Sequence, residues 1–250
     1  MEYVIGFCIA VVIALTGVGA GTITAPVLIL VLHVPASIAV GTALGYATLV
    51  KFIIAPVQIA RRQVNYRIVG WMLLGGAPGV LIGSLLFRRV AVKTVVLYWI
   101  LGTIIVFSSL MQLAGPIIRK RLKEQKERRE RPGLLALIML PIGTEVGLSS
   151  SGAGALGTLC LLQFTKLTAK DVVGTDVLFG LIVALIGSGV HFAFGAYSGA
   201  LLLKLVTGGV AGAIVGSLTS PHVPDKKLRF ALCCWLLFIG ADFCLRAAKL

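Results

Sequence analysis

Eight apolar segments, each long enough to cross a membrane as a helix, constrain the fold of this chain more than any other feature. They cover residues 3–32, 36–60, 67–87, 92–114, 133–164, 170–194, 198–220 and 228–247. Hydrophobic residues make up 58% of the chain and charged residues 13%, whereas a soluble domain has about 25% charged residues. Apolar runs of roughly 20 residues are typical of membrane helices, because the strands of a membrane barrel are shorter and alternate. The sequence therefore predicts an all-α polytopic membrane protein.

Basic residues are concentrated in short clusters between these segments. The chain carries 23 Lys and Arg against 9 Asp and Glu, a net charge of +14. The strongest cluster, Arg119–Arg131, separates the first four segments from the last four. Because Lys and Arg accumulate in cytoplasmic loops, this distribution favours a multi-pass protein of the cell (cytoplasmic) membrane, with residues 119–131 in the cytoplasm, over a nucleic-acid-binding protein.

The two groups of four segments are related in sequence. When the chain is shifted by 133 residues, GAG at 19–21 falls on GAG at 152–154. In the same register, VGT at 40–42 falls on VGT at 173–175, and GGAPGVLIGSL at 75–85 falls on GGVAGAIVGSL at 208–218. Three matches in one register are hard to obtain by chance. We expect a first transmembrane repeat over residues 1–116, a basic cytoplasmic linker over 117–132 and a second transmembrane repeat over 133–250.

The path of the first segment in each repeat decides how the repeats are related. If this segment crosses the membrane once, the repeats are parallel, and if it turns back as a hairpin, they are inverted. With residues 119–131 in the cytoplasm, the hairpin also places the basic clusters at 61–67, 166–170 and 226–229 there. It leaves Arg88, Arg89, Lys93 and the basic C-terminus outside, against the positive-inside rule. The charges favour inverted repeats, each with a broken or re-entrant first segment and three transmembrane helices.

Two glycine-rich stretches interrupt these first segments: TGVGAGTITAP at 16–26 and SSSGAGALGTL at 149–159. Backbone groups released from a helix inside a membrane are tolerated only when they are buried in protein or line a watery cavity. Transporters use such breaks to direct the N–H groups of half-helices at an anion, and glycine lets the anion approach the backbone. We therefore expect a small-anion site where the two breaks face each other. Its candidate donors are Gly19, Gly21, Thr22, Thr42, Ser149, Ser150, Ser151, Gly152, Gly154 and Thr175.

The alternative role for such glycines is close packing between helices. Two further sets recur every four residues and so form one smooth helix face each: Gly75, Gly79 and Gly83, and Gly208, Gly212 and Gly216. We expect these two sets to be packing seams.

Three ionisable residues lie inside apolar segments, where charged groups are costly and therefore indicate function. Lys51 lies ten residues before Arg61, or roughly 15 Å of helix, and we expect it to attract the anion. Asp176 and Glu145 are candidates for proton coupling, and Asp176 is also a candidate counter-ion of Lys51. Gln58 and His191, which are 133 residues apart, are expected to be polar anchors at the membrane interface.

No Ser-His-Asp spacing, metal-ligand cluster or phosphate-binding loop stands out in the sequence. We expect neither an enzyme nor an ATP-driven pump, and we predict no catalytic residue, metal or cofactor.

Several motifs resemble the TauE/SafE sulfite-exporter family, also called YfcA-like membrane proteins. They are GVGAGTITAPVLI, AVGTALGYATLVK and RRQVNYRIVGWMLLGGAPGVLIGSLL in the first half, and VGLSSSGAGALGT, VVGTDVLF and GGVAGAIVGSL in the second. The resemblance implies a secondary transporter that exports small anions, chiefly sulfite and organosulfonates, with a coupling proton or ion as a further partner. Ser149–Ser151 stand where the family commonly has glycines, and Leu159 stands where a proline would match Pro26.

Two alternatives to a coupled transporter remain open at the level of sequence. One is a passive anion channel, which would use the same broken helices. The other is a non-transporting membrane scaffold or sensor whose basic linker docks a partner.

Overall fold

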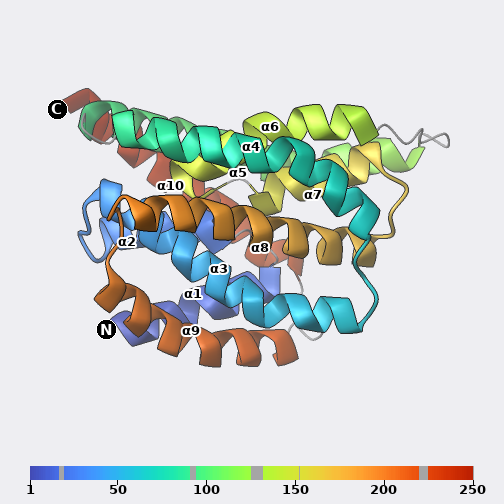
Figure 1. Cartoon of the computed structure of the whole chain (residues 1–250), viewed down its shortest axis with the longest axis horizontal. Helices are drawn as coiled ribbons and strands as arrows, with labels where there is room; N and C mark the ends of the chain where they lie inside the picture. The colour runs from blue at the N-terminus through green and yellow to red at the C-terminus, as the bar shows by residue number, and fades with distance from the viewer. Residues whose placement is uncertain (17–19, 91–93, 125–131, 152, 220–224, 250) are drawn as a thin grey trace.

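The computed structural model describes residues 1–16, 20–90, 94–124, 132–151, 153–219 and 225–249. These residues form helices joined by short connections, without a strand (Figure 1). Seven of the helices in this part of the chain are long and apolar enough to cross a membrane. The predicted all-α polytopic membrane fold is therefore confirmed.

Both predicted interruptions are present, because each first segment forms two helices. The first pair is α1 (Glu2–Thr16) and α2 (Ala20–Leu30), and the second is α6 (Pro132–Ser149) and α7 (Ala153–Phe164). The remaining segments form single helices: α3 (Ala36–Ala60), α4 (Tyr66–Val90), α5 (Thr94–Glu124), α8 (Ala169–Ala193), α9 (Gly199–Thr219) and α10 (Asp225–Lys249).

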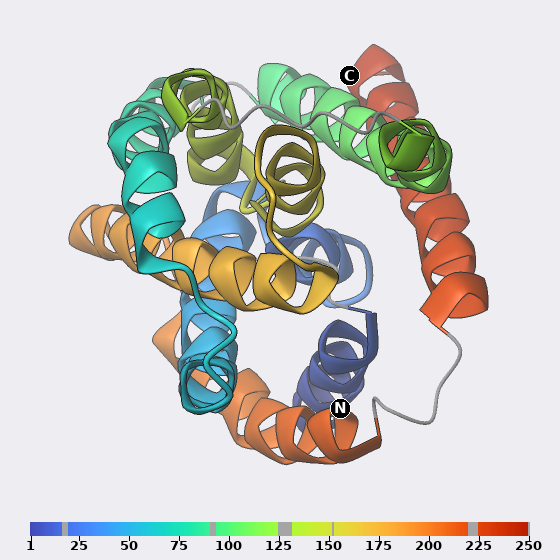
Figure 2. The same ribbon diagram turned by 90° about the vertical axis from the view of Figure 1, so that its right-hand side faces the viewer.

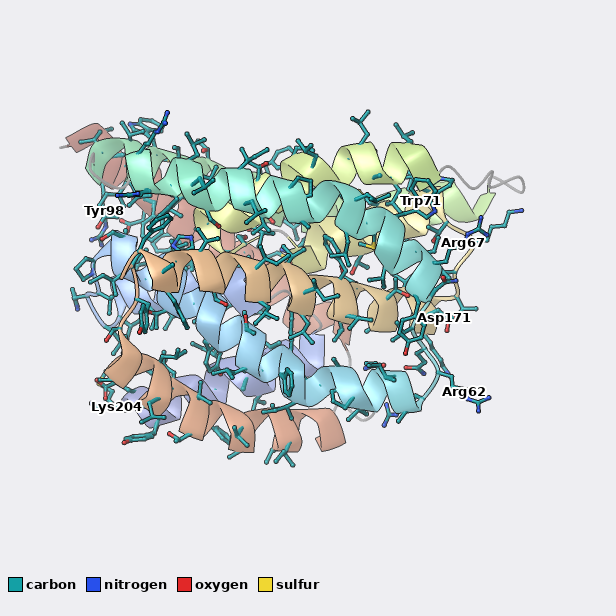
Figure 3. The ribbon with its side chains drawn as sticks, viewed as in Figure 1. Arg62, Arg67, Trp71, Tyr98, Asp171 and Lys204 are labelled. Carbon is teal, nitrogen blue, oxygen red and sulfur yellow. The ribbon has the colours of Figure 1, made fainter. Side chains whose placement is uncertain are left out.

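Each pair of short helices turns back on itself. In Figure 1, α1 begins and α2 ends at the left end of the molecule, whereas α6 begins and α7 ends at the right end. The two hairpins therefore enter from opposite ends. Arg62, Arg67 and Asp171 lie at the right end, where α6 begins, and Tyr98 and Lys204 lie at the left end (Figure 3).

Glycines hold each hairpin against a long helix. A methyl group on Gly75 or Gly79 of α4 would overlap the backbone carbonyl of Ala136 or Leu140 on α6, and the same is true for Gly83 and Thr144. Gly208 and Gly212 of α9 lie equally close to the carbonyls of Tyr3 and Phe7 on α1, and Gly216 contacts Val11. The glycines were expected to be packing seams, and this is confirmed. Within each of these pairs of contacts, the equivalent residues are 133 apart in the sequence.

Helices α3 and α8 occupy the centre of the molecule and pack against each other (Figure 1). Their contact buries large side chains such as Tyr46, Leu44 and Phe179. Figure 2 shows α5 and α10 together at one side, away from the α4–α6 and α1–α9 pairs. The hairpin tips thus lie inside a shell of long helices, and the residues at these tips are buried.

Candidate functional site

The two breaks meet in the interior of the protein. Gly21, at the start of α2, lies so close to Ser150 that a methyl group on it would overlap the Ser150 backbone and hydroxyl. Next to this contact, the Ser151 hydroxyl donates a hydrogen bond to Thr22 Oγ1 over 3.3 Å. The side chains of Thr22 and Ser151 are almost fully buried. The structure therefore brings these candidate residues together, while Gly19 and Gly152 lie outside the described residues.

Three consecutive serines form the tip of the second hairpin. Ser149 accepts a hydrogen bond from the Ser151 N–H over 3.1 Å and donates one to the Glu145 carbonyl over 3.0 Å. Ser150 has a φ of 64°, a left-handed conformation that ends α6 and costs a residue with a side chain about 1–2 kcal/mol. Its hydroxyl is buried and has no hydrogen-bond partner among the described residues. This hydroxyl is therefore available to a ligand at the break.

A buried cation lies on the central helix α3. Lys51 is 8% exposed, and its ammonium group rests against Gly180 of α8, where any larger residue would collide with it. Asp176 lies one turn before Gly180 on the same helix, so the carboxylate and the ammonium interact electrostatically. No ion pair within 4.0 Å joins the two described side chains. The two opposite charges are thus neighbours without direct contact.

The carboxylate of Asp176 connects this charge pair to the second hairpin. Thr158 of α7 donates a hydrogen bond to Asp176 Oδ2 over 3.2 Å and another to the Gly154 carbonyl over 2.7 Å. Asp176 Oδ1 lies against Gly157, where a side chain would displace it, and has no hydrogen-bond partner in the described protein. Gly154, one of the candidate residues, therefore sits one turn from the residue that binds the acid.

Two candidate threonines lie elsewhere. Thr42 accepts a hydrogen bond from the Ser198 N–H over 3.0 Å, and Thr175 accepts one from the Asn65 N–H over 3.1 Å. These contacts hold the α8–α9 and α3–α4 connections, which lie at opposite ends of the molecule (Figure 1). The structure therefore does not bring Thr42 and Thr175 to the meeting point of the breaks. Their hydroxyls hold loops.

His191 is not the interfacial anchor that was expected. It is 2% exposed, its Nε2 atom lies 3.0 Å from the Gly147 carbonyl, and its ring meets the edge of Phe87. It thus fixes the last turn of α6 ahead of the second break. Gln58 and Glu145 each have a buried carbonyl or carboxylate oxygen without a hydrogen-bond partner among the described residues. Glu145 lies one turn before Ser149 on α6.

Sequence reasoning missed Thr158, Gly157 and Gly180 as parts of the site. Gly157 and Thr158 belong to the second glycine-rich stretch, and Gly180 follows Asp176 by one helical turn. The helical spacing between Asp176 and Gly180 was the available signal, since residues four apart share a helix face. What the spacing does not give is the helix that packs on that face.

The hairpins and the buried charges define a class: a multi-pass helical membrane protein with two broken segments that meet inside it. The chain matches the family described as sulfite exporter TauE/SafE over residues 3–243. It therefore belongs to the TauE/SafE family of membrane transporters, as the motifs predicted. It is similar to the "Probable membrane transporter protein YjnA" of Bacillus subtilis (strain 168), with 26% identity over 243 residues, 94% of this chain and 95% of that protein. No solved structure matches the chain.

Proposed function

We propose that this protein is a secondary transporter that exports small sulfur-containing anions, such as sulfite or organosulfonates, across the cytoplasmic membrane. The observation that carries the proposal is the contact between the two breaks at Gly21, Thr22, Ser150 and Ser151. A buried anion needs several donors and a compensating cation to offset its lost hydration. The free Ser150 hydroxyl and the ammonium of Lys51 are such groups.

The site that we propose consists of the tips of both hairpins and the nearby charges. Gly21, Thr22, Ser149–Ser151 and Gly154 supply backbone and hydroxyl groups, with Gly19 and Gly152 as the neighbouring glycines in the sequence. Lys51 supplies the positive charge. Asp176 or Glu145 binds the coupling proton, and each has a buried oxygen that lacks a hydrogen-bond partner among the described residues.

The transport cycle in this proposal is alternating access by two inverted repeats, residues 1–116 and 133–250. Two observations support it: the hairpins enter from opposite ends (Figure 1), and helix contacts recur with the same shift of 133 residues as the sequence motifs. Rocking of one repeat against the other around a central site is the usual mechanism of such folds. We assign the end that carries Arg62 and Arg67 to the cytoplasm, because residues 119–131 connect there as well.

The test measures sulfite flux in proteoliposomes that contain wild type or the Lys51→Met variant. We expect Lys51→Met to abolish flux, because the anion would lose its compensating charge, while the protein still inserts and keeps its melting temperature. Wild-type flux in that variant would remove Lys51 from the site.

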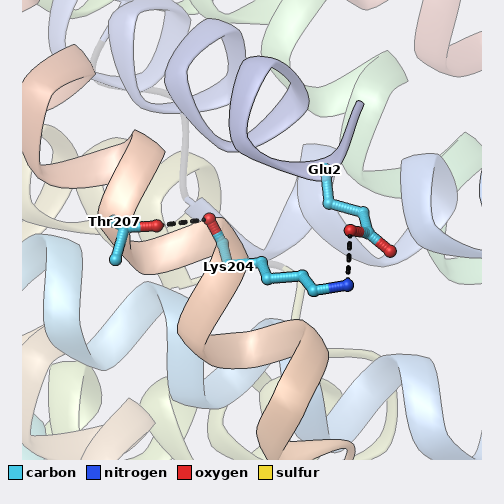
Figure 4. Close-up of polar contacts among 3 residues, drawn as sticks. All are labelled: Glu2, Lys204 and Thr207. Carbon is cyan, nitrogen blue, oxygen red and sulfur yellow. Dashed lines mark hydrogen bonds and ion pairs between the residues drawn. The ribbon is translucent and has the colours of Figure 1, made fainter.

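A matched control is Lys204→Met. Lys204 lies at the edge of the α1–α9 seam, where its ammonium pairs with Glu2 over 2.9 Å (Figure 4). Exposed ion pairs contribute about 0–1 kcal/mol, so this variant should keep wild-type flux. Counterflow, the uptake of labelled sulfite against unlabelled sulfite inside, separates a carrier from a passive channel, since only a carrier exchanges the two.

A further inference from the structure

The buried charges do not follow the internal repeat. Shifted by 133 residues, Lys51 falls on Ala184, and Asp176 falls on Ala43. Each repeat therefore contributes one charge to the α3–α8 contact, of opposite sign, and neither charge has a counterpart in the other repeat. The packing seams, by contrast, recur in both halves. Since an alanine suffices at the equivalent position, the fold of a repeat does not require either charge.

The geometry of the two charges is unusual for a structural ion pair. A buried pair stabilises a protein only when its geometry is good and its remaining polar atoms are hydrogen-bonded. Here the Lys51 ammonium rests on Gly180, no direct ion pair within 4.0 Å joins it to Asp176, and Asp176 Oδ1 has no hydrogen-bond partner in the described part of the chain. The two groups balance each other's charge, but they are not locked together.

We propose that Asp176 is a replaceable counter-ion of Lys51: an anion that binds Lys51 takes its place, and Asp176 then binds one proton from water. This inference rests on the proposed function and adds its coupling rule. The empty site is neutral, with one ammonium and one carboxylate. The loaded site is neutral as well, with the ammonium, a monovalent anion and a protonated carboxyl group. An anion that bound without the proton would leave one uncompensated negative charge in the apolar interior, which is strongly unfavourable.

Thr158 gives the protonated acid a partner. When Asp176 is ionised, the Thr158 hydroxyl donates to its Oδ2 atom. When Asp176 is protonated, the carboxyl group donates to Thr158 Oγ1, and the single Thr158 proton goes to the Gly154 carbonyl, its second acceptor at 2.7 Å. Both states are hydrogen-bonded without movement of the backbone. Because Gly154 opens α7 at the break, the proton on Asp176 is reported to the hairpin that holds the anion.

The groups around Asp176 support its assignment over Glu145. Asp176 faces Lys51 from α3, the Thr158 hydroxyl and the Cys160 thiol from α7, and Met72 from α4 beside Gly157. Lys51 is the cation among them. Glu145, in contrast, has no charged group among its interactions with the described residues. A proton on Asp176 changes the charge felt by Lys51, and a proton on Glu145 does not.

The experiment uses proteoliposomes with Asp176→Asn and two assays, with sulfite and methanesulfonate as probes. We expect this variant to keep counterflow, because its amide mimics the protonated acid, and to lose accumulation driven by a pH gradient by at least about tenfold. The control Asp171→Asn, at the beginning of the same helix, should keep both activities. Accumulation in Asp176→Asn that still follows the pH gradient overturns the inference, as does loss of that dependence in Glu145→Gln alone.

A second measurement does not depend on whether Asp176→Asn folds. Wild-type protein in weakly buffered detergent solution is mixed with each anion, and proton uptake is measured after subtraction of the anion's own ionisation. Uptake approaching one proton per bound anion supports the inference, and binding without uptake overturns it. If wild type exchanges neither anion in counterflow, the proposed function fails and the coupling rule falls with it. Counterflow without proton uptake contradicts the coupling rule alone.

Discussion

Replacing Gly21 by alanine tests whether the contact between the breaks matters. A methyl group at this position would overlap the backbone oxygen of Ser150 and its hydroxyl, so the chain at one hairpin tip must move. Overpacking of this kind costs about 1–3 kcal/mol, and the better helix propensity of alanine returns about 1 kcal/mol. We therefore expect a net loss of stability of roughly 1–2 kcal/mol.

The effect on transport should be larger than the effect on stability. A displacement of about 1 Å at a site that positions a ligand can cost roughly a hundredfold in rate, and the overlap at Gly21 requires a shift on this scale. We expect sulfite flux in proteoliposomes to fall by roughly tenfold to a hundredfold, with the protein still folded in thermal unfolding. The control is Gly189→Ala on α8, whose new methyl group would meet nothing within 4 Å. It should keep wild-type flux.

Two outcomes would refute this reasoning about Gly21. If Gly21→Ala transports sulfite like wild type at unchanged stability, the breaks tolerate separation and their contact is not the site. If Gly189→Ala loses as much flux as Gly21→Ala, the loss reflects glycine content in general. The pair of variants therefore distinguishes a local effect at the break from a global one.

Two further predictions concern single hydroxyl groups. Ser150→Gly should stabilise the protein by about 1–2 kcal/mol, because glycine adopts the left-handed conformation freely, and should weaken sulfite binding by roughly tenfold through loss of a donor to a charged ligand. Unchanged affinity measured by thermal shift would place Ser150 outside the site. Thr42→Val and Thr175→Val should each cost about 0.5–1.5 kcal/mol, because each removes the acceptor of a loop N–H, and should leave the sulfite concentration for half-maximal flux unchanged. A large change in that concentration at unchanged stability would return these threonines to the site.

The sequence was most informative about the helices and least informative about their faces. Apolar run length predicted the helices within a few residues, because membrane thickness sets this length. The breaks were predicted from glycine clusters, since backbone released inside a membrane needs a reason. Thr42 and Thr175 were misplaced because their motif repeats, and a repeated motif serves a loop contact as readily as a ligand. His191 was misplaced because proximity to a helix end in the sequence does not reveal the neighbouring helix that buries it.

The conflict between symmetry and chemistry explains where sequence reasoning succeeds in this protein. Contacts that shape each half, such as Gly79 on Leu140 and Gly212 on Phe7, occur twice and are visible as matched motifs. The groups that carry charge, Lys51 and Asp176, occur once and face alanine in the register of the repeat. A frame built twice offers each hairpin the same path, whereas a single anion needs one cation. The departures from the repeat are therefore the residues at which we expect transport chemistry, and a variant that restores the repeat at Lys51 by Lys51→Ala should keep the fold and lose the anion.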